Sequence, residues 1–179
     1  MTDQDRLAPT ELRAALLDGE LYTVGDAYLS IADTDDTARR AREFGAAVGH
    51  PSLVAERTSA AWIWGGLSRA PVRHTACMRP GTRLRGPFPG IVVREPALTG
   101  AELVRIDGVW VTTPLRTAVD LLRDGRAGLD GVRGLIHARG IDAAAIRSAL
   151  ETAGPRPQWR RALRVLRTIE RPDQEARTG

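Results

Sequence analysis

The strongest constraint on the fold of this chain is a hairpin pattern in the second half of its sequence. Two apolar runs, at 103–106 and 109–112, flank the pair Asp107-Gly108. Asp-Gly between two such runs is typical of a β-hairpin with a two-residue turn. In this register the aliphatic side chains share one face. Arg105 lies opposite Trp110 on the other face, where the indole can cover the arginine stem.

An amphipathic helix is predicted directly after this hairpin. Thr113 is a favoured N-cap, and Pro114 suits the first helical position. The apolar stripe of this helix consists of Leu115, Ala118, Val119 and Leu122. Arg116, Asp120 and Arg123 lie on a neighbouring face. Their simplest interpretation is an intrahelical ion pair worth a few tenths of a kcal/mol, and the alternative is a clamp for an anion or a base.

Shorter patterns predict the elements on either side of this unit. Strands are expected at 21–24, 27–31, 53–55, 72–78 and 91–95, and helices at 10–18, 36–48, 60–64, 129–138, 143–153 and 157–170. Thr58-Ser59 is the expected cap of the helix at 60–64, and Gly65-Gly66 its stop. A boundary is expected near Gly49-His50-Pro51, and a loose end over 171–179.

Composition describes an ordinary globular protein. The chain has 179 residues, of which 42% are hydrophobic and 27% charged, which fits one domain with or without a small appendage. It has one cysteine, Cys77, so no intramolecular disulfide can form. No apolar run approaches the roughly 18 residues of a membrane span, and the acidic first thirty residues do not resemble a signal peptide. We therefore expect a cytoplasmic protein without a membrane partner.

Positive charge is concentrated in the later parts of the sequence. All 26 basic residues are arginines, which a GC-rich coding bias would explain, and the formal net charge is +4. Residues 1–50 hold 5 arginines against 10 acids, a net charge of −5, whereas residues 51–100 hold 7 against 2, a net charge of +5. Residues 151–179 hold 7 against 4, a net charge of +3. A polyanion should therefore meet the later parts first.

Two groups of arginines are candidate nucleic-acid contacts. Arg160, Arg164 and Arg167 follow one another at helical spacing on the last predicted helix, and Arg79, Arg83 and Arg85 lie in or beside a loop rich in Pro and Gly. Like charges at i, i+4 repel by a few tenths of a kcal/mol, which favours a partner such as phosphate or an acidic protein face. The alternative is a solvated surface in an arginine-rich proteome.

No catalytic residue, metal site or cofactor is predicted. A chain without lysine cannot form a P-loop, and dinucleotide and nucleophile-elbow motifs are missing from the sequence. His74 and Cys77 point to opposite faces of a predicted strand, so they cannot chelate one metal together. Trp62 and Trp64 lie about 200° apart on a helix. Either one is core and the other partly exposed, or the whole helix is deeply buried.

Two motifs carry a family resemblance when they are considered together. Residues 58–65 read Thr-Ser-Ala-Ala-Trp-Ile-Trp-Gly, and residues 108–121 read Gly-Val-Trp-Val-Thr-Thr-Pro-Leu-Arg-Thr-Ala-Val-Asp-Leu. They resemble the S-x-x-[ST]-A-A-x-L-W-G helix and the G-[LV]-x-V-T-[TS]-P-x-R-T-[LA]-x-D-L segment of the AbiEi-type antitoxins of type IV toxin–antitoxin systems. The matched positions are Thr58, Trp62, Trp64, Gly65, Thr113, Pro114, Arg116, Thr117 and Asp120. The segment 16–28 looks like the end of the family's winged helix-turn-helix.

This resemblance implies an α+β protein with three parts. They are a small, degenerate winged-helix-like head over 1–50, an antitoxin domain over 51–170 with a mainly antiparallel sheet and C-terminal helices, and a flexible tail over 171–179. Actinobacterial relatives often carry a further endonuclease-like domain, which this chain is expected to lack. In the family the head binds operator DNA. Here the head is acidic, so we expect any DNA contact at the two arginine groups instead.

The resemblance implies a non-enzymatic antitoxin and transcriptional regulator. Its expected partners are double-stranded operator DNA and, indirectly, a nucleotidyltransferase-like toxin, while the oligomeric state stays open. Two alternatives remain. The first is a nucleic-acid-processing enzyme or its remnant, which predicts at least two acids with raised pKa values converging in a basic cleft. The second is a protein-interaction module that does not bind nucleic acid.

Overall fold

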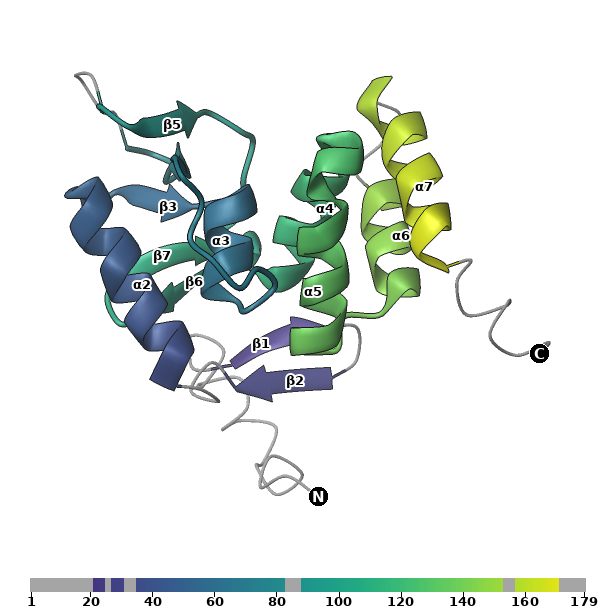
Figure 1. The fold of residues 1–179 in the computed structure, drawn as a ribbon, viewed down its shortest axis with the longest axis horizontal. Helices are drawn as coiled ribbons and strands as arrows, with labels where there is room; N and C mark the ends of the chain where they lie inside the picture. Colours follow the sequence, from purple (N-terminus) through teal and green to yellow (C-terminus); the bar gives the residue numbers. More distant parts are fainter. Residues whose placement is uncertain (1–20, 25–26, 31–34, 83–87, 153–156, 171–179) are drawn as a thin grey trace.

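A computed structural model describes residues 21–24, 27–30, 35–82, 88–152 and 157–170 of the chain (Figure 1). Its strands are β1 (Leu21–Val24), β2 (Ala27–Ser30), β3 (Leu53–Ala55), β4 (His74–Met78), β5 (Ile91–Arg94), β6 (Leu103–Ile106) and β7 (Val109–Thr112). Its α-helices are α2 (Asp35–Val48), α3 (Arg57–Ile63), α4 (Pro114–Arg123), α5 (Leu129–Arg139), α6 (Ala143–Thr152) and α7 (Pro157–Glu170). This mixture confirms the α+β class. The helix expected at 10–18 and the tail at 171–179 lie outside the described residues.

Five strands form one mixed sheet in the order β5-β4-β3-β7-β6, and β1 pairs with β2 in a separate antiparallel hairpin. The pairs β3–β4 and β6–β7 are antiparallel, whereas β3–β7 and β4–β5 are parallel, so this sheet is not mainly antiparallel as expected. The β6–β7 hairpin has the predicted register, with Ile106 opposite Val109 and Arg105 opposite Trp110. The central parallel pair joins Val54 to Trp110, two positions that no local sequence pattern connects.

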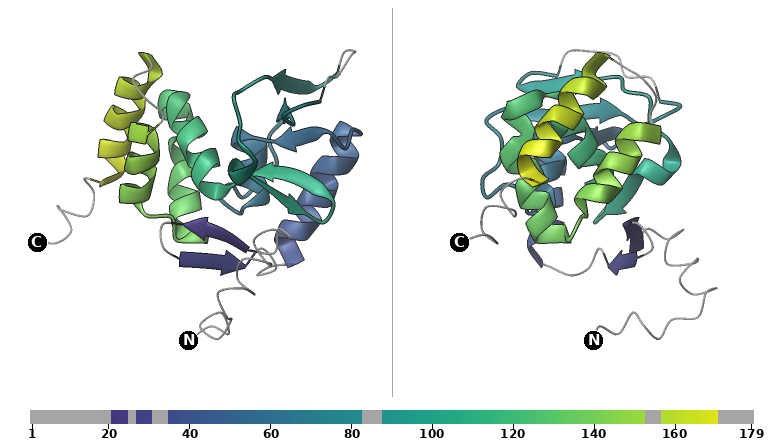
Figure 2. Two further views of the ribbon diagram at one scale, coloured as in Figure 1. Left: turned by 180° about the vertical axis from the view of Figure 1, so that it is seen from behind. Right: turned by 90° about the vertical axis from the view of Figure 1, so that its right-hand side faces the viewer.

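Helices α2 and α3 cover one face of this sheet, and α4 to α7 form a second helical layer beside it (Figures 1 and 2). Successive side chains of a strand point to opposite faces of the sheet, so the face covered by helices is the one opposite Trp110 and Cys77. On this covered face, Ala55, Ala76 and Val111 are fully buried. Helix α4 lies at the centre of the second layer and contacts α3, α5, α6 and α7. A single apolar core therefore joins the sheet to the helices.

The start of α3 differs from the prediction. Thr58-Ser59 does not cap it, because the helix begins at Arg57 with Glu56 in the N-cap position. The Ser59 hydroxyl instead accepts a hydrogen bond from the backbone N–H of Thr75 at 2.9 Å, and it lies 3.0 Å from Nδ1 of His74. Its side chain is therefore used to fasten α3 to the neighbouring strand β4. That strand is shorter than predicted and begins at His74.

Glycines after α3 and within α5 allow these two helices to approach each other. Gly65 stops the helix as expected, with a backbone φ of 80° in the left-handed region that favours glycine. A Cβ atom on Gly134 of α5 would lie 1.9 Å from the carbonyl oxygen of Gly66. The two backbones are therefore in direct contact, and no side chain fits between them.

Candidate functional site

Helix α4 begins with the cap that the sequence predicts. The Thr113 hydroxyl accepts a hydrogen bond from the backbone N–H of Arg116 at 3.3 Å, and Pro114 occupies the first turn. The Thr117 hydroxyl donates to the carbonyl oxygen of Thr113 at 2.8 Å and lies 2.8 Å from the hydroxyl of Thr112. These motif residues fix the junction between β7 and α4.

Arg116, Asp120 and Arg123 form an ion network inside the protein rather than on its surface. Arg116 Nε donates to Asp120 Oδ2 at 2.6 Å, and Arg123 Nη1 donates to Asp120 Oδ1 at 2.9 Å. Asp120 is 3% exposed. The expected intrahelical pair therefore exists, but its burial makes it more costly to break than the exposed pair that the sequence suggested.

The network continues into the connection between β5 and β6. Arg116 Nη1 donates to Glu102 Oε1 at 2.7 Å and to the carbonyl oxygen of Ala97 at 3.0 Å. Burial alone would raise the pKa of Glu102, but hydrogen bonds from Thr99 and Arg116 hold it below its ordinary value. The sequence analysis did not single out Glu102. A signal was present, because Glu102 lies three residues after Thr99, which is the spacing of a capping box. The structure contains this capping box.

Glu56 is a buried carboxyl beside this network. It is 1% exposed, and its Oε1 has no hydrogen-bond partner among the described residues. Burial raises its pKa to about 7, with Arg94 opposing that rise and Asp120 adding to it. Arg94 Nη1 lies 4.0 Å from Glu56 Oε1. Asp120, the carboxylate that adds to the rise in the pKa of Glu56, is itself bound by Arg116 and Arg123.

The first motif anchors α3 in the core. Trp62 and Trp64 are both buried, at 5% and 0% exposure, so the deeply buried alternative is the correct one. Trp64 Nε1 donates to the carbonyl oxygen of Thr112 at 2.8 Å. The guanidinium of Arg139 lies over the Trp64 ring at 5.2 Å from its centroid, and Arg139 also donates to the Thr37 hydroxyl.

The candidate arginines on α7 lie on its outer face. Arg160, Arg164 and Arg167 are all exposed, while Ala162 and Leu166 on the opposite face are fully buried. None of these three arginines forms an ion pair within the described ranges. They present a row of positive charge along the helix that lies at the far end of the molecule from the sheet (Figures 1 and 2).

The second candidate group is only partly described. Arg83 and Arg85 lie outside the described residues, whereas Arg79 is exposed beside the end of β4. Its guanidinium lies 5.5 Å from the ring centroid of Trp110, and that of Arg105 lies 5.9 Å from the same centroid. The structure therefore joins Arg79 to the hairpin and not to the arginines of α7.

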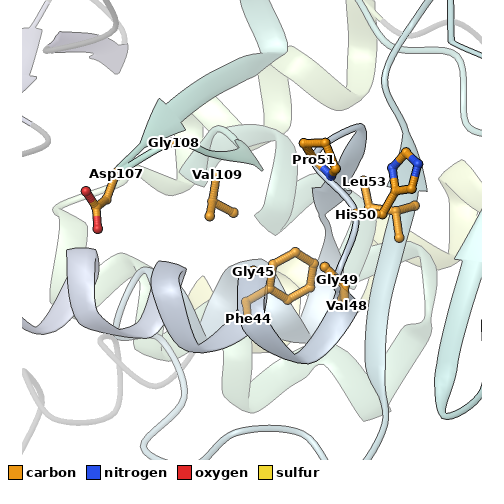
Figure 3. Close-up of a pocket in the computed structure, with 10 residues that line it drawn as sticks. All are labelled: Phe44, Gly45, Val48, Gly49, His50, Pro51, Leu53, Asp107, Gly108 and Val109. Atoms are coloured by element: carbon orange, nitrogen blue, oxygen red, sulfur yellow. The ribbon is translucent and has the colours of Figure 1, made fainter.

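A hollow of about 280 Å³ lies between the end of α2 and the turn of the β6–β7 hairpin (Figure 3). Its lining is mostly apolar and includes Phe44, Val48, Leu53 and Val109, with Asp107 and His50 at opposite ends. The Asp107 carboxylate accepts a hydrogen bond from Arg42 at 2.8 Å. Gly108 and Val109 of the second sequence motif line this hollow, whereas no described residue of the two arginine groups does.

Comparison with known families gives a match to the model of the AbiEi antitoxin C-terminal domain over residues 53–168. The chain belongs to the AbiEi antitoxin family. Within the span matched to the AbiEi model lie both sequence motifs, the buried ion network and the arginines of α7. No curated protein matches the sequence.

One solved structure with a similar fold is the crystal structure of the RV2827C protein from Mycobacterium tuberculosis. The two chains are 20% identical with a TM-score of 0.48, and the match covers 92% of this AbiEi-family chain and 65% of the other. Within the described part of the chain, no helix is both long and apolar enough to cross a membrane. The same residues contain no group of three or more His, Cys, Asp or Glu side chains suited to a metal ion.

Proposed function

We propose that this chain is a non-enzymatic antitoxin and transcriptional regulator of a type IV toxin–antitoxin system, acting in the cytoplasm. It binds double-stranded operator DNA and counteracts a nucleotidyltransferase-like toxin without a cofactor. Membership of the AbiEi family supports the antitoxin role. We further propose a head over 1–50, an antitoxin domain over 51–170 and a tail over 171–179.

The observation that carries the DNA-binding part is the exposed row of Arg160, Arg164 and Arg167 on α7. Their spacing places like charges on adjacent turns, where they repel one another. No described carboxylate neutralises them, in contrast to Arg147 of α6, whose guanidinium binds Glu170 at the end of α7 at 2.6 Å. Phosphate groups of a duplex would supply the missing negative charge.

Duplex binding measured against salt concentration tests this proposal. The probe is a labelled duplex from the region upstream of the chain's own gene. We expect log K to fall linearly with log salt, with a slope of about −0.9 for each phosphate contact. Replacing all three α7 arginines by glutamine should reduce that slope by about 3 in magnitude. Arg79→Gln should reduce it by about 1 more if Arg79 also contacts phosphate.

Arg39→Gln is the matched control, because Arg39 is an exposed arginine that is already paired with Asp36 and Glu43. We expect this variant to bind the duplex like the unchanged protein. A slope near zero would reject DNA binding and favour the interaction module that does not bind nucleic acid. A triple variant that binds like the control would reject the α7 arginines as the duplex contact.

Co-expression with a nucleotidyltransferase-like toxin encoded next to the chain tests the antitoxin part. We expect the unchanged chain to restore growth of cells that produce the toxin. Glu56→Gln should restore growth equally well, because a non-enzymatic antitoxin needs no ionisable carboxyl at that position. Loss of rescue in this variant, while the variant remains folded and abundant, would argue for the enzyme alternative.

A further inference from the structure

The second face of the five-stranded sheet carries a cluster of long side chains. The register places Arg105 beside Trp110, and Trp110 beside Val54 of the central strand. Val54 in turn pairs with Cys77, and Arg79 follows two residues later on the same face. Trp110 thus lies between side chains contributed by β6 and by the end of β4. We call Arg79, Trp110 and Arg105 the Trp110 cluster.

The Trp110 cluster is open to solvent. Arg79 and Arg105 are exposed, and Trp110 is partly exposed. Helices α2 and α3 lie on the other face of the sheet, where α2 brings Gly45 against Val109 and α3 packs against β4. The hairpin that carries Trp110 and Arg105 is seen from this side in Figure 2. A ligand can therefore reach the cluster without displacing a helix.

No described carboxylate neutralises the guanidinium of Arg79 or that of Arg105. Neither Arg79 nor Arg105 forms an ion pair with any residue that the structure describes, and Arg105 Nε donates only to the carbonyl oxygen of Gly108, at 3.3 Å. The nearby carboxylates are already engaged, Asp107 by Arg42 and Glu102 by Arg116. Two cations gathered around one indole repel each other. An anion bound between them would remove that repulsion.

The indole of Trp110 favours one class of anion. Unpaired bases stack on aromatic rings and on guanidinium planes, while arginines beside them bind the phosphates of the same strand. The bases of an intact duplex are stacked inside the helix and do not present their faces to a ring on a sheet. An acidic peptide would use the two charges but not the ring. The combination therefore favours a single strand over both a duplex and a peptide.

We infer that the Trp110 cluster is a binding site for single-stranded nucleic acid, with one base stacked against Trp110 and flanking phosphates bound by Arg79 and Arg105. This site is separate from the duplex-binding row on α7, and it stands or falls independently of that row. RNA and DNA single strands share this chemistry, so both enter the test.

Binding of labelled oligonucleotides to the full-length chain tests the inference. The probes are strands of about 12 uridines and about 12 thymidines, which match the usual length of single-strand sites, and a blunt duplex of the same length. We expect Trp110→Ala to weaken single-strand binding by about tenfold or more, as loss of a stacked base does. Trp110→Phe should retain most of the affinity. Arg105→Gln should reduce the magnitude of the salt slope by about 0.7.

Arg133→Gln is the control, because Arg133 is an exposed arginine of α5 outside both proposed sites. This variant and the glutamine variants of α7 should leave single-strand affinity unchanged, which separates this site from the proposed operator contact. A Trp110→Ala protein that keeps its melting temperature and binds single strands within twofold of the unchanged chain would overturn the inference. An acidic peptide that displaces the bound single strand equally well from the Trp110 variants and from the unchanged chain would overturn it too.

Discussion

Glu56 shows how a single side chain makes stability depend on pH. The unfolded chain releases its proton near the ordinary pKa of 4.5, whereas burial delays release in the folded chain to about pH 7. Between these values the folded state binds more protons than the unfolded state, so the free energy of unfolding falls as pH rises through this window. Above it, the ionised carboxyl costs the folded state about 3 kcal/mol.

Glu56→Gln should therefore stabilise the protein at neutral to alkaline pH. Glutamine keeps the shape of the side chain but carries no charge to bury. We expect an increase of up to about 3 kcal/mol in the free energy of unfolding at about pH 8, and little change at about pH 5. Urea denaturation at both pH values measures this difference. Glu43→Gln, at an exposed carboxyl of α2, serves as the control, and equal stability of the Glu56 variant and the unchanged chain at the higher pH would contradict the prediction.

Single residues also show where sequence reasoning stops. Asp120 was recognised by its spacing to Arg116 and Arg123, because positions on one helix can be placed from the sequence alone. The buried network could not be predicted in this way, since its partner Arg116 also binds Glu102 and Ala97 from another segment. Glu56 gave no local signal, because a buried carboxyl at the start of a helix has the same sequence as an exposed cap.

At the scale of elements, helix α4 is the part on which the rest depends. It is capped by Thr113, fixed to β7 through Thr117, and packed against every helix of the second layer. Its bounds and those of the β6–β7 hairpin were predictable because caps, turn residues and apolar spacing are local. The parallel pairing of β3 with β7 was not, because these strands lie far apart in the sequence. The parallel pairing of β4 with β5 was not either, because no local pattern in the loop between these consecutive strands indicates their relative direction.

Asp120→Asn should destabilise the protein through this helix. The substitution keeps the volume of the side chain but leaves the buried Arg116 without its closest counter-charge. Breaking a buried pair in this way costs about 3 to 5 kcal/mol. Asp36→Asn, which affects an exposed pair on α2, should cost less than about 1 kcal/mol. Urea midpoints compare the two variants, and similar small losses in both would show that the α4 network contributes little.

The molecule as a whole is held together by one core that runs from the sheet through α3 and α4 to the last helices. Fully buried side chains follow this route without interruption, from Val111 in the sheet through Ile63 and Leu122 to Leu166 in α7. The outermost helices bury their apolar stripes against α4 rather than against one another alone. We therefore expect sheet and helices to lose their structure together.

Thermal unfolding tests this cooperativity. Circular dichroism in the far ultraviolet follows the helices, and the near-ultraviolet signal follows the packed tryptophans, including Trp64 in the core. We expect one transition with the same midpoint for both signals. An earlier helical transition with unchanged tryptophan signal would indicate that α6 and α7 unfold separately and would contradict a shared core.

The position of Arg139 has a consequence for the speed of folding. Its side chain joins Thr37 of α2 and the carbonyl oxygen of Trp64, partners that are 102 and 75 residues away in the chain. Segments that lie far apart in the sequence must meet before these contacts can form. Proteins rich in such non-local pairings fold in milliseconds to seconds rather than in microseconds. A newly synthesised chain thus has to emerge to the end of α5 before the guanidinium of Arg139 can cover the ring of Trp64.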